Sequence, residues 1–341
     1  MHYLFNGFYR LAPVRTLQIK TYIRRMSTIR EIEIPVPWGH IAGRESGPAD
    51  GRPLLMLHGW LDNCGTYEAI QTHLPPTYRC VNIDLPGHGR SSHLPPGPMI
   101  GSAIALGTYV VRMVRDHYGW SRFSIMGHSM GSGVGVLYAA CFPEDVASLT
   151  ILDLVKFITR PVEQHPANAR EAVLSYLEVQ RKMTTNERPQ YTYEALQQRL
   201  ISVLGGDMDA TAADALLARG ARRNPDTGLY ESTYDLRLRT RTFQSMDFVG
   251  WREFASRLRC RLLLVLAEQG GTWISAEEEE AEAIQTYRQA VPELRLERLP
   301  GGHHVHLTHP ERVLPIINEF LTAEPDTAAV TAAAATGRSG L

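Results

Sequence analysis

The sequence predicts an α/β fold with a mostly parallel, doubly wound sheet, and two observations support this. Short, continuously apolar segments recur along the chain, as expected for parallel strands buried on both faces. These segments are residues 53–59, 80–87, 123–127, 148–153 and 261–267. Stretches with apolar residues at helical spacing, such as 106–117 and 313–320, separate most of them. The alternation of strand and helix favours a sheet covered by helices on both faces.

One long segment interrupts this alternation. Residues 155–250 contain no strongly β-like run, whereas 168–183, 193–204 and 212–223 have helical character. We therefore expect a helical cap at 155–250, inserted into a core formed by two stretches of chain. The two stretches of the core are residues 31–154 and 251–323.

The two ends of the chain differ from this core in composition. The first 30 residues carry six Arg or Lys residues and no acidic residue, as in a mitochondrial leader, but a disordered basic extension fits equally well. The expected location is the mitochondrion in the first case and the cytoplasm in the second. The terminal Ser-Gly-Leu lacks the basic middle residue of a peroxisomal address. Residues 324–341 are rich in alanine and are expected to form a disordered tail.

Composition narrows the range of partners. A net charge of −1 argues against nucleic acid, and no apolar run reaches the roughly 18 residues of a membrane-spanning helix. The four cysteines lie far apart, so neither a zinc site nor a disulfide framework is predicted, and no phosphate-binding or dinucleotide motif is present. We expect a soluble protein that acts on a small molecule and needs no cofactor or metal. The oligomeric state is left open.

The segment Gly127-His128-Ser129-Met130-Gly131 is the strongest functional signal. It follows a predicted strand and opens a predicted helix, which is the context of a nucleophile elbow. The two glycines are expected where larger side chains would collide with neighbouring backbone. A plain glycine-rich turn is the alternative interpretation, but the setting favours a serine nucleophile.

A serine hydroxyl needs a base to accept its proton and a carboxylate to orient that base. His303 is the candidate base, in a glycine-containing loop that also carries His304, His306 and His309 as competitors. A metal site in this histidine-rich loop lacks matching carboxylate or cysteine spacing.

Two carboxylates end predicted strands and preserve the chain order of serine, acid and histidine. These are Asp153 and Glu268, of which Asp153 is favoured. Acyl transfer also requires donors to the developing oxyanion. The backbone N–H groups of Trp60, after the strand that ends in His58-Gly59, and of Met130 are the candidates.

The motifs His58-Gly59-Trp60, "DLPGHGRSS", "GHSMG" and "GGHHVHLTHPE", in this order, resemble the α/β-hydrolase superfamily. "EIPVPWGHIAG" followed by "LHGWLDN" resembles its serine hydrolase-like branch, near the haloalkane dehalogenases and epoxide hydrolases. The resemblance covers about 29–323. It implies the α/β-hydrolase fold, Ser129 as nucleophile, His303 as base, and Trp60 and Met130 as oxyanion donors.

The position of the acid is less regular. The resemblance places Asp153 after the sixth strand and Glu268 near the commoner position after the seventh, but "AEQGG" lacks the aspartate usual there.

Dehalogenases and epoxide hydrolases attack with aspartate, so a serine argues against both reactions. The expected activity is that of a serine hydrolase of the carboxylesterase type, cleaving an ester, thioester or amide of a small, apolar acyl group. The alternative is a receptor with the same fold that binds a ligand with little or no turnover.

Overall fold

A computed structural model describes residues 28–97, 102–185, 188–205, 208–243, 245–270 and 277–323. Most of the basic N-terminal segment and the whole alanine-rich tail lie outside the described residues. Arg30, which was assigned to the N-terminal extension, is instead the first residue of a strand.

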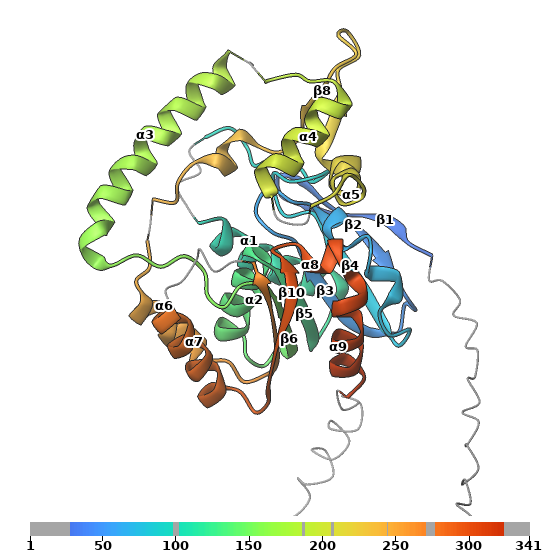
Figure 1. Ribbon diagram of the computed structural model, residues 1–341, viewed down its shortest axis with the longest axis vertical. Coiled ribbons are helices and arrows are strands. Elements are labelled where there is room, and N and C mark those ends of the chain that lie inside the picture. Colours follow the sequence, from blue (N-terminus) through green and yellow to red (C-terminus); the bar gives the residue numbers. More distant parts are fainter. Residues whose placement is uncertain are drawn as a thin grey trace, which may run out of the picture.

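An eight-stranded sheet forms the centre of the molecule (Figure 1), in the order β1-β2-β4-β3-β5-β6-β9-β10. Strands β1 and β2 pair antiparallel, β2 and β4 pair antiparallel, and all other neighbours are parallel. The predicted mostly parallel sheet is therefore confirmed. The strands are β1 (Arg30–Val36), β2 (Gly39–Ser46), β3 (Arg52–Leu57), β4 (Tyr78–Ile83), β5 (Phe123–His128), β6 (Val146–Leu152), β9 (Arg261–Gln269) and β10 (Leu294–Gly302).

Helices cover both faces of this sheet, and each face has its own apolar core. The larger core includes side chains of α1 (Ala103–Tyr118), α2 (Met130–Cys141), α6 (Phe248–Ala255) and α7 (Glu277–Ala290). The smaller core lies on the other face, beneath α9 (Pro310–Thr322) and the short helix η1 (Cys64–Tyr67). Strands β3, β5, β6 and β9 run between the two cores, which explains their continuously apolar sequences.

The segment between β6 and β9 holds most of the remaining helices, together with a small hairpin that was not predicted. Its elements are η3 (Val162–Gln164), α3 (His165–Thr184), α4 (Tyr193–Leu204), α5 (Ala210–Gly220), β7 (Ala221–Arg223), β8 (Tyr230–Ser232) and η4 (Leu236–Arg239). In Figure 1, α3 forms an outlying arm, and α4 and α5 lie above the sheet.

The prediction of a helix through 212–223 was wrong at its end. Helix α5 stops at Gly220, and β7 pairs antiparallel with β8. The cause is the turn between them, where Asn224 N–H donates to Leu229 O (2.7 Å) and Gly228 adopts a φ of 73°. The expected boundary at 250 also divides helix α6, which packs against α2.

Arg219 on α5 connects this inserted segment to the core. Its fully buried guanidinium donates from Nε and Nη2 to Asp84 Oδ2 (3.0 and 2.8 Å), and from Nη1 to both carboxylate oxygens of Glu31 (2.7 and 2.6 Å). Burial alone would raise the pKa of Asp84, but Arg219 lowers it below its usual value. The pair therefore depends on both charges being present.

Replacing Arg219 with methionine is expected to lower the free energy of unfolding at neutral pH by about 3–5 kcal/mol, because the buried Asp84 carboxylate loses its partner. The loss should be present above the unfolded-state pKa of aspartate, about 3.9, and should fade as pH falls through the lower folded-state value. Urea unfolding at several pH values measures it. Arg223→Met, on the exposed part of β7, is the control and should change stability by less than about 0.5 kcal/mol. Equal losses of unfolding free energy in Arg219→Met and Arg223→Met would contradict the conclusion that Arg219 stabilises the buried Asp84 carboxylate.

Candidate active site

Ser129 lies at the tight turn between β5 and α2. Its φ of 50° and ψ of −118° place a non-glycine residue in a strained conformation, and its N–H donates to Leu152 O at 3.0 Å. A Cβ added at Gly127 would lie 2.4 Å from Gly131 O, and one added at Gly131 would lie 2.1 Å from Leu57 O. Both glycines are therefore required for the turn that projects the serine.

His303 and Asp153 meet at the carboxyl ends of β10 and β6. His303 Nδ1 lies 2.6 Å from Asp153 Oδ2. The other carboxylate oxygen, Oδ1, accepts from Ala267 N–H at 2.8 Å, and Asp153 N–H donates to Val265 O at 2.8 Å. Asp153 has a φ of 51° and is buried, so the carboxylate is held in place by β9 on one side and contacts the histidine on the other.

Three of the other candidates from the sequence lie elsewhere. Glu268 is exposed near the end of β9 and is not among the described residues that line the cavity around Ser129. His306 Nε2 lies 2.9 Å from Thr66 Oγ1, and His309 Nδ1 lies 3.5 Å from Glu311. Of the two carboxylates that the sequence left open, the structure brings Asp153 to His303.

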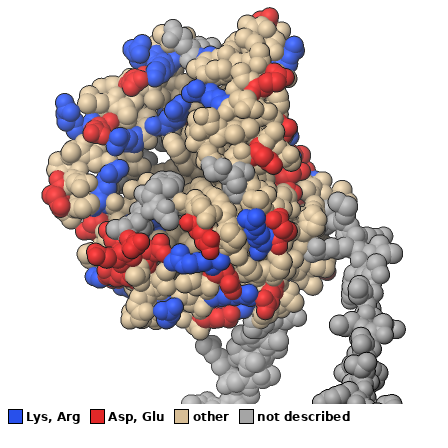
Figure 2. All heavy atoms as spheres, viewed as in Figure 1, with Lys and Arg blue, Asp and Glu red and all other residues tan. Residues whose placement is uncertain are grey.

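A cavity of about 1010 Å³ opens above Ser129, His303 and Met130. Figure 2 shows a hollow on this side of the molecule, between the α3 arm and the rest of the chain. Apolar side chains from the core and from the inserted segment make up much of the cavity lining, including Ile104, Leu137, Leu154, Phe157, Ile158, Val203, Leu204, Leu238 and Met246. The cavity can therefore receive an apolar group beside the serine.

The two expected oxyanion donors belong to residues that line this cavity. Met130 opens α2, where a backbone N–H has no acceptor within the helix. The Trp60 side chain donates from Nε1 to Leu238 O at 2.8 Å, which also holds the inserted segment to the turn after β3. His58 Nε2 accepts from Leu85 N–H at 2.9 Å and connects that turn to the loop after β4.

Asp62 is a buried residue of this site for which the sequence suggested no role. Its carboxylate lies 3.2 Å from His304 Nε2 and 3.4 Å from His128 Nδ1, and all three residues line the cavity. Burial alone would raise the pKa of Asp62, but His304 and His128 lower it well below its usual value. Burial lowers the pKa of His128 to about 4. The only signal in the sequence was the position of Asp62 in "LHGWLDN", three residues after the strand-ending glycine.

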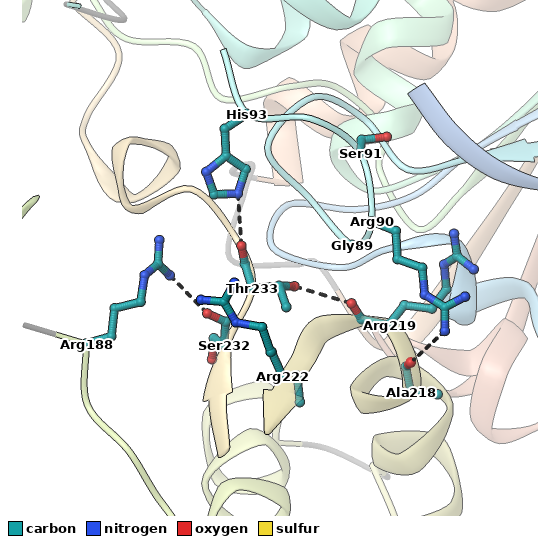
Figure 3. A pocket seen from close by; sticks show the side chains of 11 residues that line it. Gly89, Arg90, Ser91, His93, Arg188, Ala218, Arg219, Arg222, Ser232 and Thr233 are labelled. Atoms are coloured by element: carbon teal, nitrogen blue, oxygen red, sulfur yellow. Dashed lines mark hydrogen bonds between the residues drawn. The ribbon is translucent and has the colours of Figure 1, made fainter. Parts of the chain in front are cut away.

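A second cavity, of about 370 Å³, lies beside the loop after β4 and the β7–β8 hairpin (Figure 3). Its arginines already have partners. Arg188 donates to Ser232 O (2.9 Å), Arg222 donates to Glu231 (2.5 Å), and Arg219 is paired as described above. Since the lining residues hold the fold together, we place the candidate active site at Ser129.

Gly270 tests the geometry of the carboxylate. A Cβ at this position would lie 2.2 Å from Asp153 Oδ2, the oxygen that contacts His303. Gly270→Ala should therefore displace the Asp153 carboxylate and lower kcat for the expected ester hydrolysis by about 10-fold or more. A displacement of about 1 Å in a catalytic group lowers the rate by up to about 100-fold. Circular dichroism checks that the variant is folded. Gly205→Ala, where an added Cβ meets nothing within 4 Å but φ is +60°, is a control for backbone strain alone. Equal activity in the two variants would contradict the prediction.

Comparison with known proteins shows the family to which the chain belongs. The sequence pattern of the alpha/beta hydrolase fold family matches residues 52–310. The chain belongs to the α/β-hydrolase family. It is 34% identical over 311 residues to the "Serine hydrolase-like protein" of Danio rerio, a match that covers 90% of this chain and 92% of the relative. It is 33% identical to "Serine hydrolase-like protein 2" of Homo sapiens, with 86% and 94% covered.

Solved structures show the same fold. A hypothetical protein from Pseudomonas aeruginosa superimposes with a TM-score of 0.75 at 30% identity, covering 86% of this chain and 98% of that protein. The "Thioesterase Domain From Curacin Biosynthetic Pathway" superimposes with a TM-score of 0.69 at 19% identity, a likeness that shows the fold alone. Among the described residues, no helix has the length and apolar character needed to cross a membrane.

Proposed function

We propose that this α/β hydrolase cleaves a carboxylic ester of a small, apolar acyl group through an acyl-enzyme on Ser129. The observation that carries this proposal is the 2.6 Å contact between His303 Nδ1 and Asp153 Oδ2, in a loop that borders the same cavity as the strained serine. A histidine whose Nδ1–H donates to a carboxylate presents an unprotonated Nε2, which is the state a general base requires.

In the proposed reaction, Ser129 Oγ attacks the ester carbonyl carbon while His303 Nε2 takes the hydroxyl proton. The oxyanion is held by the backbone N–H groups of Trp60 and Met130. Collapse of the tetrahedral intermediate breaks the bond to the alcohol, which leaves with the proton from His303. Water then attacks the acyl-enzyme with the same histidine as base, and the acid and the free serine are regenerated. Asp153 keeps the imidazole oriented in both halves.

The lining of the cavity supports an apolar substrate. Of the three arginines among the described residues of the lining, Arg160, Arg237 and Arg241, two pair with carboxylates: Arg237 with Asp235 at 2.6 Å and Arg241 with Glu171 at 3.0 Å. The apolar side chains of the lining therefore set the preference. Thioesters and amides share the same acyl-enzyme chemistry and are the alternative substrates.

Hydrolysis of p-nitrophenyl esters of increasing acyl length tests this proposal. We expect turnover whose kcat/KM rises from short to medium chains, because each buried methylene contributes about 0.8 kcal/mol. Ser129→Ala is the matched control. Saturable binding of the esters with no turnover above that control would contradict the proposal and would favour a ligand-binding receptor.

A further inference from the structure

Three buried side chains form a compact cluster beneath the candidate active site. Asp62 comes from the turn after β3, His128 from the end of β5, and His304 from the loop after β10. Their relative exposures are 4%, 1% and 5%, and one nitrogen or oxygen atom from each lies within 4.8 Å of the other two. All three line the cavity that contains Ser129, so a small ion can reach them from solvent.

The hydrogen bonding of His128 leaves one of its two ring nitrogen atoms without a hydrogen-bond partner among the described residues. His128 Nε2 lies 2.9 Å from the carbonyl oxygen of His303. A carbonyl oxygen can only accept a hydrogen bond, so Nε2 carries the hydrogen. In the neutral imidazole Nδ1 then has no hydrogen and carries a lone pair. Nδ1 is buried and has no hydrogen-bond partner among the described residues, and it lies 3.4 Å from Asp62 Oδ2. Two acceptors therefore face each other, an arrangement that a cation between them would stabilise.

Two of the distances within the cluster match a tetrahedral metal site, and the ligand atoms of all three residues lie within 4.8 Å of one another. Ligand atoms about 2.0–2.1 Å from a tetrahedral zinc ion are about 3.3–3.4 Å from each other. Asp62 Oδ2 lies 3.4 Å from His128 Nδ1 and 3.2 Å from His304 Nε2. The His303 carbonyl that holds the other nitrogen of His128 is the kind of outer partner that orients metal-bound histidines.

We propose that Asp62, His128 and His304 bind a divalent transition-metal ion of the zinc type. Two imidazoles and one carboxylate favour Zn²⁺, Co²⁺, Ni²⁺ or Cu²⁺ over Mg²⁺ and Ca²⁺, which prefer oxygen ligands alone. Sequence spacing predicted no metal because the carboxylate is 242 residues away from His304 along the chain. Since the site is defined by binding, it stands or falls independently of the proposed hydrolysis.

Titration of the purified chain with Co²⁺ near neutral pH tests this proposal, because tetrahedral Co²⁺ gives a visible absorption band. We expect one Co²⁺ per chain, displaced by Zn²⁺ and not by Mg²⁺. Asp62→Asn and His304→Gln should each weaken binding by at least about 100-fold, the upper range for loss of an outer partner. His309→Gln, a histidine of the same loop outside the cluster, should bind as the wild type does.

A further variant separates this site from metal bound to the candidate catalytic pair. His303→Ala removes the imidazole but keeps the carbonyl that contacts His128, so it should retain the band. Circular dichroism of every variant shows whether it is folded, and His304→Gln decides the matter if Asp62→Asn does not fold. Absence of binding by the folded wild type would overturn the proposal. So would binding that survives both cluster variants, or binding that is lost only in His303→Ala.

Discussion

Replacement of Ser129 by alanine is expected to lower kcat for ester hydrolysis on the order of 10⁶-fold, the scale seen when a triad serine is removed. The structure supplies the reason. The serine is the residue that the strained turn after β5 projects into the cavity. Without this hydroxyl, His303 would have no serine to activate, and we expect the proposed oxyanion donors alone to provide the residual rate. Steady-state kinetics on the preferred p-nitrophenyl ester measure the loss.

Ser121→Ala is the matched control, because Ser121 is an exposed serine just before β5. It should keep wild-type kcat and KM. A Ser129→Ala variant that retained more than about 1% of wild-type kcat while folded would mean that another group performs the attack.

Asp153→Asn is expected to lower kcat by about 10⁴-fold with little change in stability, because asparagine keeps the shape of the side chain but allows the wrong histidine tautomer. Its Oδ1 position can still accept from Ala267 N–H, so the local structure should persist. Glu268→Gln should change kcat by less than about twofold, since Glu268 is exposed. Parallel kinetics on the two variants measure the difference. A large loss in Glu268→Gln with a small loss in Asp153→Asn would reverse the assignment of the acid.

Much of the fold could be predicted because the central strands are buried on both faces. Segments such as 123–127 and 261–267 are continuously apolar for that reason, and both lie in strands of the sheet. The antiparallel strands β1 and β2 were not predicted. β1 has a largely exposed face, so its sequence "REIEIPV" alternates and does not form an apolar run. The β7–β8 hairpin was missed because its three-residue strands are shorter than any pattern that sequence periodicity detects.

Some residues of the candidate site could likewise be predicted from the sequence, and others could not. Ser129 could be singled out because its constraints are local, namely two glycines that have no room for a Cβ. The sequence favoured Asp153 but did not exclude Glu268, since both residues follow apolar runs near strand ends. The choice depends on where the loop after β10 places His303, which is a tertiary contact over 150 residues. Asp62 was missed because its histidine partners come from two other segments of the chain.

Intact-mass analysis after reaction with a fluorophosphonate probe tests directly whether Ser129 is an activated nucleophile. The wild type should gain one adduct per chain, and the Ser129→Ala and His303→Ala variants should gain none on the same time scale. The folded wild type remaining unlabelled would contradict an activated serine, and equal labelling of Ser129→Ala would place the nucleophile elsewhere.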